Sequence, residues 1–299
     1  MLGDAARERG INNASDGGSH GGASLPLVQP QGWSGGIDSR VVKPISATYP
    51  VNHRVLGRIG QLGITCSGAL VGRRLFLTAA HCVVPPSGAQ LSYDVRIRRS
   101  GNTTPYGTVT TNQYWYSGNW IPNGCNANGG SFPQVCVQHD WALLILPANA
   151  WDASPNGTPG WMGYWTYDQN FIANNAVNNN DGYPSCFEVG APSGCSSSNL
   201  LNVWGQIGRG TATAFANPHD GVPAFYRTDR DLSPGQSGSP NWTDYIGPNG
   251  PFVIGIASAE LCTGSCASET GSVKSHPNAY RGMTPFLADF ISQQRVANP

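Results

Sequence analysis

The sequence is poor in charged residues. Only 11% of its 299 residues are charged, and 17 Lys and Arg residues balance 17 Asp and Glu residues, which makes the formal net charge zero. No surplus of either sign is available to attract nucleic acid or an anionic membrane surface. We therefore expect neither nucleic acid nor a membrane among the partners.

Long hydrophobic runs are also missing. The longest strongly apolar run covers residues 141–146, whereas a membrane-spanning helix needs about 20 apolar residues. No apolar segment follows the charged residues near the start, which are Asp4, Arg7, Glu8 and Arg9, and no signal peptide is visible. We expect either that a secretion signal has been removed or that the printed sequence begins after it.

Cysteine, by contrast, is plentiful. Eight cysteines predict four disulfides and an oxidising compartment, although the sequence leaves their connectivity open. Proximity along the chain favours the pairs Cys66–Cys82, Cys125–Cys136, Cys186–Cys195 and Cys262–Cys266. No pair has the CxxC spacing of a zinc site, and no histidine lies at zinc-site spacing from a cysteine pair, so we expect no metal. We expect no other cofactor either.

The abundance of turn-forming residues predicts the fold class. The chain contains 39 Gly and 23 Pro residues, which suit short strands joined by turns. The predicted strands are residues 55–59, 64–71, 75–78, 93–98, 141–146, 186–189, 201–207, 210–215, 224–228 and 252–258. We predict an all-β fold of two packed six-stranded antiparallel β-barrels, closed by a C-terminal α-helix that Thr284 and Pro285 begin.

The same reading divides the chain into three parts. Residues 1–35 read as a flexible leader or the remnant of a pro-segment, with ordered structure beginning near Val41. The N-terminal barrel would occupy residues 36–150 and the C-terminal barrel with the helix residues 151–299, with a connection at 148–159. Residues 174–181 are rich in asparagine and predict a plain surface loop, with calcium binding as the alternative.

A histidine, an aspartate and a serine then stand in local settings that suit nucleophilic catalysis. His81 follows a β-type run and two alanines, and Cys82 beside it could hold its loop rigid. Asp140 opens an apolar strand, where a carboxylate is costly unless it is paired. A histidine N–H satisfies such a carboxylate and is fixed in one tautomer by it. The adjacent His139 is expected to be structural.

Ser237 lies between Gly235 and Gly238 in a Gly-Gln-Ser-Gly sequence. The glycines let the backbone turn tightly and expose the hydroxyl. They also allow the N–H groups of Gly235 and Ser237 to point at one spot, where an oxyanion would form. The order histidine, aspartate, serine excludes the α/β-hydrolase elbow, which runs serine, acid, histidine.

These segments resemble those of the trypsin/chymotrypsin-like serine peptidases. The sequences around His81 (Thr-Ala-Ala-His-Cys), Asp140 (Asp-Trp-Ala-Leu-Leu) and Ser237 (Gly-Gln-Ser-Gly-Ser-Pro) carry the resemblance, which extends over about residues 41–294. Residues 105–109, 262–266 and 280–282 are similar to the secreted microbial branch that includes glutamyl endopeptidases. The resemblance implies a double β-barrel with His81 as general base, Asp140 as its orienting group and Ser237 as nucleophile.

Gln236 departs from the pattern of the animal members. There, the residue before the serine is an aspartate that pairs with a freed N-terminal ammonium group. A glutamine cannot form this ion pair, so we expect no activation switch of that kind. Removal of an N-terminal segment remains open.

A second departure concerns the residue recognised at the cleaved bond. Glutamyl-specific relatives place a histidine in the pocket strand where this chain has Ala257. Asp231 stands where trypsin-like enzymes carry the carboxylate at the pocket floor, and Glu260 follows the pocket strand. Two acids favour Arg or Lys at the cleaved position, while a glutamyl or another preference stays open. By the resemblance, Ser258 supports the catalytic acid and shapes substrate binding.

The sequence therefore predicts a secreted, monomeric serine endopeptidase that acts on proteins or peptides. Two alternatives remain. One is an inactive homologue that binds a partner, and the other is an esterase with the same three residues. Covalent labelling of the serine separates the first from an enzyme, and turnover of peptide against simple ester substrates separates the second.

Overall fold

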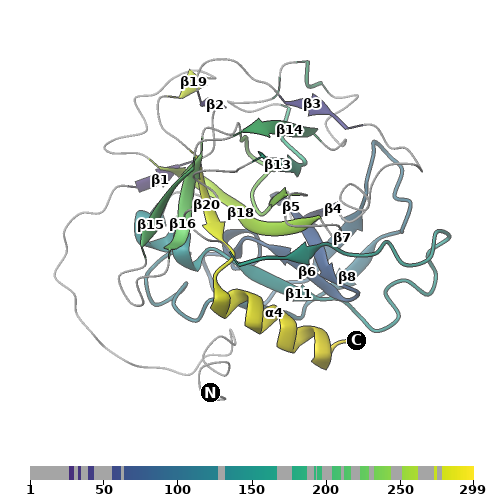
Figure 1. The fold of residues 1–299 in the computed structure, drawn as a ribbon. Coiled ribbons are helices and arrows are strands. Elements are labelled where there is room, and N and C mark those ends of the chain that lie inside the picture. The colour runs from purple at the N-terminus through teal and green to yellow at the C-terminus, as the bar shows by residue number, and fades with distance from the viewer. Residues whose placement is uncertain are drawn as a thin grey trace.

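The fold is described from a computed structural model. It describes residues 27–29, 33–34, 40–43, 56–61, 64–126, 132–166, 177–186, 192, 194–196, 204–209, 212–216, 223–228, 232–243, 251–261, 273–274 and 278–299. All structural statements below concern these residues. Figure 1 shows two curled sheets side by side, with the helix α4 (Pro285–Ala297) along their lower edge.

The first sheet has seven strands in the order β8-β7-β4-β5-β6-β11-β9. In this order the strands are β8 (Val109–Thr111), β7 (Tyr93–Ile97), β4 (Leu56–Gln61), β5 (Ile64–Gly72), β6 (Leu75–Thr78), β11 (Ala142–Ile145) and β9 (Tyr114–Tyr116). All pairings within it are antiparallel.

The second sheet has eleven strands, eight of them along the path β15-β16-β20-β18-β17-β13-β14-β3. These are β15 (Ala212–Ala216), β16 (Pro223–Thr228), β20 (Asn278–Gly282), β18 (Phe252–Leu261), β17 (Pro240–Thr243), β13 (Val177–Gly182), β14 (Trp204–Arg209) and β3 (Val41–Val42). The others are β1 (Leu27–Gln29), β10 (Phe132–Pro133) and β12 (Gly163–Tyr164), and β2 (Trp33–Ser34) pairs separately with β19 (Val273–Lys274).

The interior of the seven-stranded sheet is apolar. Strand β6 is buried over its whole length, and β7 alternates buried and partly exposed residues as a one-sided strand should. The ring of Phe76 fills the space between two glycines. A Cβ at Gly57 would lie 2.5 Å from this ring, and one at Gly68 2.4 Å, so a side chain at either position would displace it.

The terminal helix begins as predicted. Thr284 caps it, since its hydroxyl accepts a hydrogen bond from Leu287 N at 3.3 Å, and Pro285 is the first helical residue. Phe290 packs against two tryptophans of the seven-stranded side. The ring centroids lie 5.6 Å from Trp115 and 5.5 Å from Trp141.

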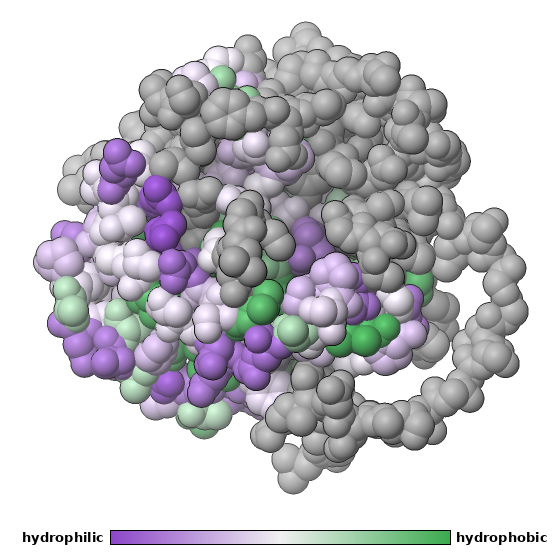
Figure 2. Space-filling view, turned by 180° about the vertical axis from the view of Figure 1, so that it is seen from behind, coloured by the Kyte–Doolittle hydropathy of each residue, from purple (hydrophilic) through white to green (hydrophobic). Residues whose placement is uncertain are grey.

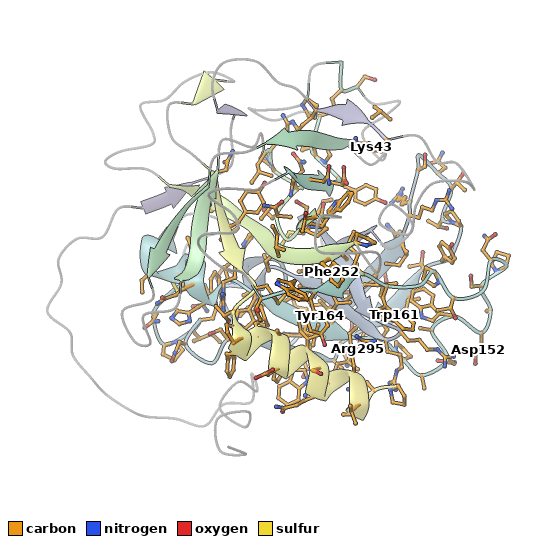
Figure 3. The ribbon with its side chains drawn as sticks, viewed as in Figure 1. Lys43, Asp152, Trp161, Tyr164, Phe252 and Arg295 are labelled. Carbon is orange, nitrogen blue, oxygen red and sulfur yellow. A yellow bond between two sulfur atoms is a disulfide. The ribbon has the colours of Figure 1, made fainter. Side chains whose placement is uncertain are left out.

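The other end of the helix reaches the eleven-stranded sheet. The Arg295 guanidinium lies 5.5 Å from the ring centroid of Trp161 and 6.0 Å from that of Tyr164 in β12. Figure 3 shows these three side chains together above α4, with Phe252 of β18 beside them. Because β12 pairs with β18, these cation–π contacts join the helix to the second sheet.

The chain crosses from one sheet to the other between β11 and β12. Trp151 ties this crossing to the first sheet, since its Nε1 donates to Arg73 O at 2.7 Å. Met162 N donates to Leu70 O at 2.9 Å. The proposed lobe boundary at 150/151 falls in this crossing, and we keep the division into two lobes as a proposal.

The β-rich fold with two sheet units and a C-terminal helix is confirmed, but the strands are not shared six and six. Short strands that the sequence does not signal account for the difference. Strands β1 and β2 lie before Val41, where ordered structure is predicted to begin, and β1 pairs with β10 and β18. A three-residue strand in a Gly- and Ser-rich region gives too short a pattern to recognise.

The Asn-rich loop prediction is wrong, because residues 177–182 form β13 between β14 and β17. The side chains of Asn179, Asn180 and Asp181 are buried there. Asn180 Nδ2 donates to Ser239 Oγ at 2.9 Å and Pro240 O at 3.2 Å, and Asp181 Oδ2 accepts from Trp242 Nε1 at 2.8 Å. Such bonds offset the cost of burying an amide, so a run that looks like a surface loop lies inside the sheet.

Three of the predicted disulfides are confirmed. They join Cys66 to Cys82, Cys125 to Cys136 and Cys186 to Cys195. The pair Cys262–Cys266 lies outside the described residues. Cys186, the one described residue of the strand predicted at 186–189, is not in a strand.

The described surface is mixed in character. On the face that Figure 2 shows, hydrophobic residues form small scattered areas among hydrophilic ones in the coloured part of the chain. Among the described residues, no helix has the length and hydrophobicity to cross a membrane.

Candidate active site

His81 lies in a short 3₁₀ turn (Ala80–Cys82) that directly follows β6. Ala79 and Ala80 are fully buried, and the neighbouring Cys82 is bonded to Cys66 of β5. Small residues let this turn pack tightly against the sheet, and the disulfide fixes its end. The imidazole stays partly open to solvent, with 17% of the side chain exposed.

Asp140 follows the 3₁₀ turn η3 (Gln134–His139) and precedes β11. Its side chain is fully buried. One carboxylate oxygen accepts from His81 N at 3.0 Å, and the other contacts His81 Nδ1 at 2.8 Å. Ser258 Oγ donates to that second oxygen at 2.5 Å. These bonds provide the pairing that a buried carboxylate requires.

The Asp140 contact determines which nitrogen of the imidazole carries the proton. A carboxylate only accepts hydrogen bonds, so His81 Nδ1 must carry a hydrogen to bond it. In the neutral ring, Nε2 is then the accepting nitrogen. This is the form in which a histidine takes a proton from a hydroxyl.

Ser237 lies in the turn formed by residues 233–239, which we call the serine turn. Gly235 and Gly238 have φ angles of +91° and +77°, which favour glycine. A Cβ at Gly235 would lie 2.4 Å from Tyr183 O, and one at Gly238 2.5 Å from Ser67 O. Both conformation and space therefore require glycine on either side of the serine.

Ser67 of β5 fastens the serine turn to the seven-stranded sheet. Its N–H donates to Ser237 O at 2.8 Å and its hydroxyl to Gly235 O at 2.7 Å. The same hydroxyl accepts from Tyr183 N at 2.8 Å. The sequence analysis missed Ser67, because its partners lie 168 and 116 residues away in the chain.

Strand β18 connects the serine turn to Asp140. Gly238 N donates to Ala257 O at 2.7 Å, and Ala257 N donates to Ser239 O at 2.8 Å. The next residue, Ser258, is the one that bonds Asp140. Gly238 also packs against Ala79, whose N would lie 2.8 Å from a Cβ there. The segments that carry His81, Asp140 and Ser237 thus meet at one place between the sheets.

The predicted specificity residues are only partly placed. Ala257 is fully buried and Ser258 nearly so. Glu260 lies in β18, where its backbone is opposite Gln29 and Asn278. Asp231 lies outside the described residues.

A histidine and a cysteine cluster beside the site have structural explanations. Gln138 Nε2 lies 3.1 Å from His139 Nε2, and Ser117 Oγ lies 3.0 Å from His139 Nδ1, so both ring nitrogens have partners. In the described part of the chain, Cys66, His81 and Cys82 form a cluster with metal-ligand spacing. Both sulfur atoms are in the disulfide, however, so the cluster has no thiolate to offer a metal.

The tyrosines near the His81 turn are shifted in acidity. Burial raises the pKa of Tyr93, with a further contribution from Tyr114. Burial likewise raises the pKa of Tyr114 and of Tyr116. Tyr93 remains a donor, and its hydroxyl bonds Val83 O at 2.7 Å, two residues after His81.

Solved structures of proteases share the fold. A Glu endopeptidase in complex with MPD matches with a TM-score of 0.60 and 18% identity over 87% of this chain and 98% of that one. HL collagenase matches with a TM-score of 0.53 and 17% identity over 85% and 98% of the two chains. At these identities the matches support the fold alone.

Sequence comparisons agree. A glutamyl endopeptidase of Bacillus licheniformis is 26% identical over 98 residues, which cover 32% of this chain and 30% of that protein. The match therefore spans less than a third of the relative. The family model described as Trypsin matches residues 41–281, which include all three segments of the site. The chain belongs to the Trypsin family.

Proposed function

We propose that the protein is a serine endopeptidase that hydrolyses peptide bonds through an acyl-enzyme intermediate. The observation that carries the proposal is the buried Asp140 carboxylate, which contacts His81 Nδ1 at 2.8 Å beside the serine turn. A buried carboxylate bonded to a partly exposed imidazole, next to a serine turn with two constrained glycines, is the arrangement that acyl transfer needs.

In the proposed reaction, Ser237 Oγ attacks the carbonyl carbon of the substrate and its proton passes to His81 Nε2. Asp140 stabilises the imidazolium that results. The N–H groups of Gly235 and Ser237 stabilise the oxyanion. The C–N bond then breaks, and His81 returns the proton to the leaving amine. Water, deprotonated by His81, hydrolyses the ester and restores Ser237.

The site also supports a proposal for specificity, which is a preference for Arg or Lys before the cleaved bond. Ala257 is fully buried, and its methyl group cannot serve as a polar partner for a glutamate side chain. Asp231 and Glu260 are the acids that would pair with a basic residue. The alternative is a glutamyl preference, which the names of two relatives suggest. Reading the residue before each cut in a digested, denatured protein mixture decides between them.

We further propose that the protein is secreted and acts as a monomer. Three disulfides among the described residues support secretion, because disulfides persist in oxidising compartments. The small, scattered hydrophobic areas in Figure 2 suit a surface that faces water.

The direct test of the activity is Ser237→Ala, compared with Ser92→Ala, which changes an exposed serine outside the site. We expect Ser237→Ala to lower kcat for peptide hydrolysis by about 10⁶, with a small residual rate from the oxyanion donors and substrate binding, and Ser92→Ala to keep the wild-type rate. Equal hydrolysis by both variants would overturn the assignment. A folded wild-type protein that hydrolyses esters but no peptide would point to the esterase alternative.

A further inference from the structure

Two adjacent residues of β5 hold the two halves of the candidate site. Cys66 is bonded to Cys82, the residue after the proposed base. Ser67, the next residue of the strand, bonds the carbonyl oxygens of Gly235 and Ser237 in the serine turn. The segment that carries the proposed base and the turn that carries the proposed nucleophile are therefore fastened to neighbouring positions of one strand.

The bonds from Ser67 act on the two residues that supply the proposed oxyanion donors. Its hydroxyl donates to Gly235 O at 2.7 Å, and its N–H donates to Ser237 O at 2.8 Å. The proposed donors are the N–H groups of these same two residues. Gly235 has no Cβ and a φ of +91°, so its own conformational preference does not fix the direction of its carbonyl. The Ser67 hydroxyl provides that restraint.

The Ser67 hydroxyl is buried and bonded on both sides. While it donates to Gly235 O, it accepts from Tyr183 N at 2.8 Å. Only 1% of Ser67 is exposed, so water cannot take the place of a missing hydroxyl. Removing it would leave a buried carbonyl and a buried N–H without these partners, and the carbonyl belongs to the serine turn.

Thr78 holds Ser67 from the side of the proposed base. Its Oγ1 donates to Ser67 O at 2.7 Å. Thr78 is fully buried at the end of β6, the strand that leads into the His81 turn. A Cβ at Gly238 would lie 2.2 Å from Thr78 Oγ1, so the same hydroxyl also lies against the serine turn. The two hydroxyls thus connect the His81 segment to the turn that carries the nucleophile.

We propose that Ser67 is a positioning residue for the oxyanion donors, and that Thr78 holds Ser67 in place. The inference rests on the proposed endopeptidase function. Ser67 belongs to β5, but its side chain is part of the polar support of the serine turn. It acts through the carbonyl groups of that turn and does not itself react. Without the hydroxyl, the Gly235 peptide would be free to turn, and the donors would no longer be aimed at the oxyanion.

The test compares Ser67→Ala with Thr111→Val in the full chain. Thr111 is a matched control, because its buried hydroxyl has the same pattern of bonds. It donates to Ile145 O at 2.6 Å and accepts from Gln113 N at 3.1 Å, but it lies in β8 at one edge of the same sheet. The measurements are the melting temperature, kcat and KM on a peptide substrate, and the inhibition constant of a peptide aldehyde. The aldehyde forms a tetrahedral adduct whose oxygen takes the position of the oxyanion.

Both substitutions should lower the melting temperature, because each removes a buried hydrogen bond. Only Ser67→Ala should lower kcat, by roughly 10- to 100-fold, since small displacements of groups that act in the transition state carry losses of that order. KM should change little, whereas the aldehyde should bind Ser67→Ala more weakly by a factor similar to the loss in kcat. A folded Ser67→Ala protein with wild-type kcat would overturn the proposal, and so would equal losses of kcat in the two variants.

Thr78→Val decides the matter if Ser67→Ala does not fold. Valine keeps the shape of the side chain and leaves the Ser67 hydroxyl in place, but it removes the donor to Ser67 O. We expect a loss of kcat smaller than that of Ser67→Ala, again with KM nearly unchanged. A folded Thr78→Val protein with wild-type kcat would contradict the proposal. A wild-type protein without any hydrolysis would refute the endopeptidase function, and this inference with it.

Discussion

The two sides of the candidate site are held together by different physics. On the seven-stranded side, the turn that carries His81 rests on an apolar interior of residues such as Leu70, Phe76 and Leu77. On the eleven-stranded side, the serine turn rests on a buried polar network of Arg40, Asn180, Ser233 and Gln236. Apolar packing gives stability without direction, whereas hydrogen bonds fix orientation.

This difference suggests a division of roles. The proposed base, His81, would need a stable platform and one oriented contact, which Asp140 provides. The proposed nucleophile, Ser237, would need backbone donors aimed at one point, which a directional network provides. Perturbing the first side should therefore lower the free energy of unfolding, and perturbing the second should lower kcat.

Among the substitutions that leave Ser237 in place, Asp140→Asn should have the largest effect on kcat, because it acts on the contact that orients the His81 imidazole. The amide cannot both accept from His81 Nδ1 and satisfy its present donors, so the tautomer of His81 is lost. We expect kcat to fall by about 10⁴, the loss seen when the orienting acid of such a triad becomes an amide. Steady-state kinetics measures it, and a loss below tenfold would argue against the orienting role.

The division of roles is tested by a pair of substitutions, one on each side. Phe76→Ala should lower the free energy of unfolding by about 3–5 kcal/mol, because the ring fills the barrel between Gly57 and Gly68, and kcat of the folded protein should persist.

Asn180→Ala on the other side should lower the free energy of unfolding by about 1–3 kcal/mol, since it leaves buried partners unsatisfied. It should also lower kcat of the folded protein. Urea unfolding and kinetics on both variants measure these effects. If Phe76→Ala lowered kcat more than Asn180→Ala, the division of roles would be wrong.

Two glycine substitutions, one in the serine turn and one outside it, test how much the close approach of the serine turn to Ser67 contributes to stability. Gly238→Ala places a Cβ 2.5 Å from Ser67 O at a φ of +77°. We expect this substitution to lower the free energy of unfolding by about 2–4 kcal/mol, because backbone strain and overpacking act together. Gly101 has a φ of +54° with no atom within 4 Å of a Cβ, so Gly101→Ala should cost only about 1 kcal/mol. Equal losses in urea unfolding would show that the close approach at Gly238 is unimportant.

The smallest expected change in the free energy of unfolding comes from the hydrogen bond between the Tyr93 hydroxyl and Val83 O on the seven-stranded side. Tyr93→Phe removes the hydrogen bond to Val83 O and should cost about 1 kcal/mol at neutral pH. Because burial raises the pKa of Tyr93 in the folded protein, the unfolded chain releases the proton first. The wild type should therefore lose stability as the pH rises above about 10, and Tyr93→Phe should lose less. The measurement is the free energy of unfolding of both proteins as a function of pH. An equal decrease for the wild type and Tyr93→Phe above about pH 10 would contradict this prediction.

The structure of the seven-stranded side could be predicted from the sequence better than that of the eleven-stranded side. The His81 and Asp140 segments lie next to apolar strands, and the strand at 75–78 was predicted with its observed bounds. Local pattern was enough there, because packing residues alternate or run together in the sequence. The Thr284 cap likewise lies beside the helix it begins.

The polar side was not predictable from local pattern. The side chains of Arg40, Ser67 and Asn180 have partners in the serine turn 56 to 196 residues away, and no spacing rule connects such positions. Asn180 lies in a run of asparagines that reads as a loop, since its burial depends on bonds to Ser239 and Pro240. The specificity pocket stays a prediction, because Asp231 lies outside the described residues and Glu260 is placed by its backbone alone.

Covalent labelling tests the central claim most directly. The wild-type protein and Ser237→Ala are treated with an organophosphonate at matched concentration, and the modified residue is located by peptide mass mapping. The account predicts one adduct per wild-type molecule, on Ser237, and none on Ser237→Ala. A folded wild-type protein that takes up no label, or that carries it on another residue, would contradict the assignment of Ser237 as the nucleophile.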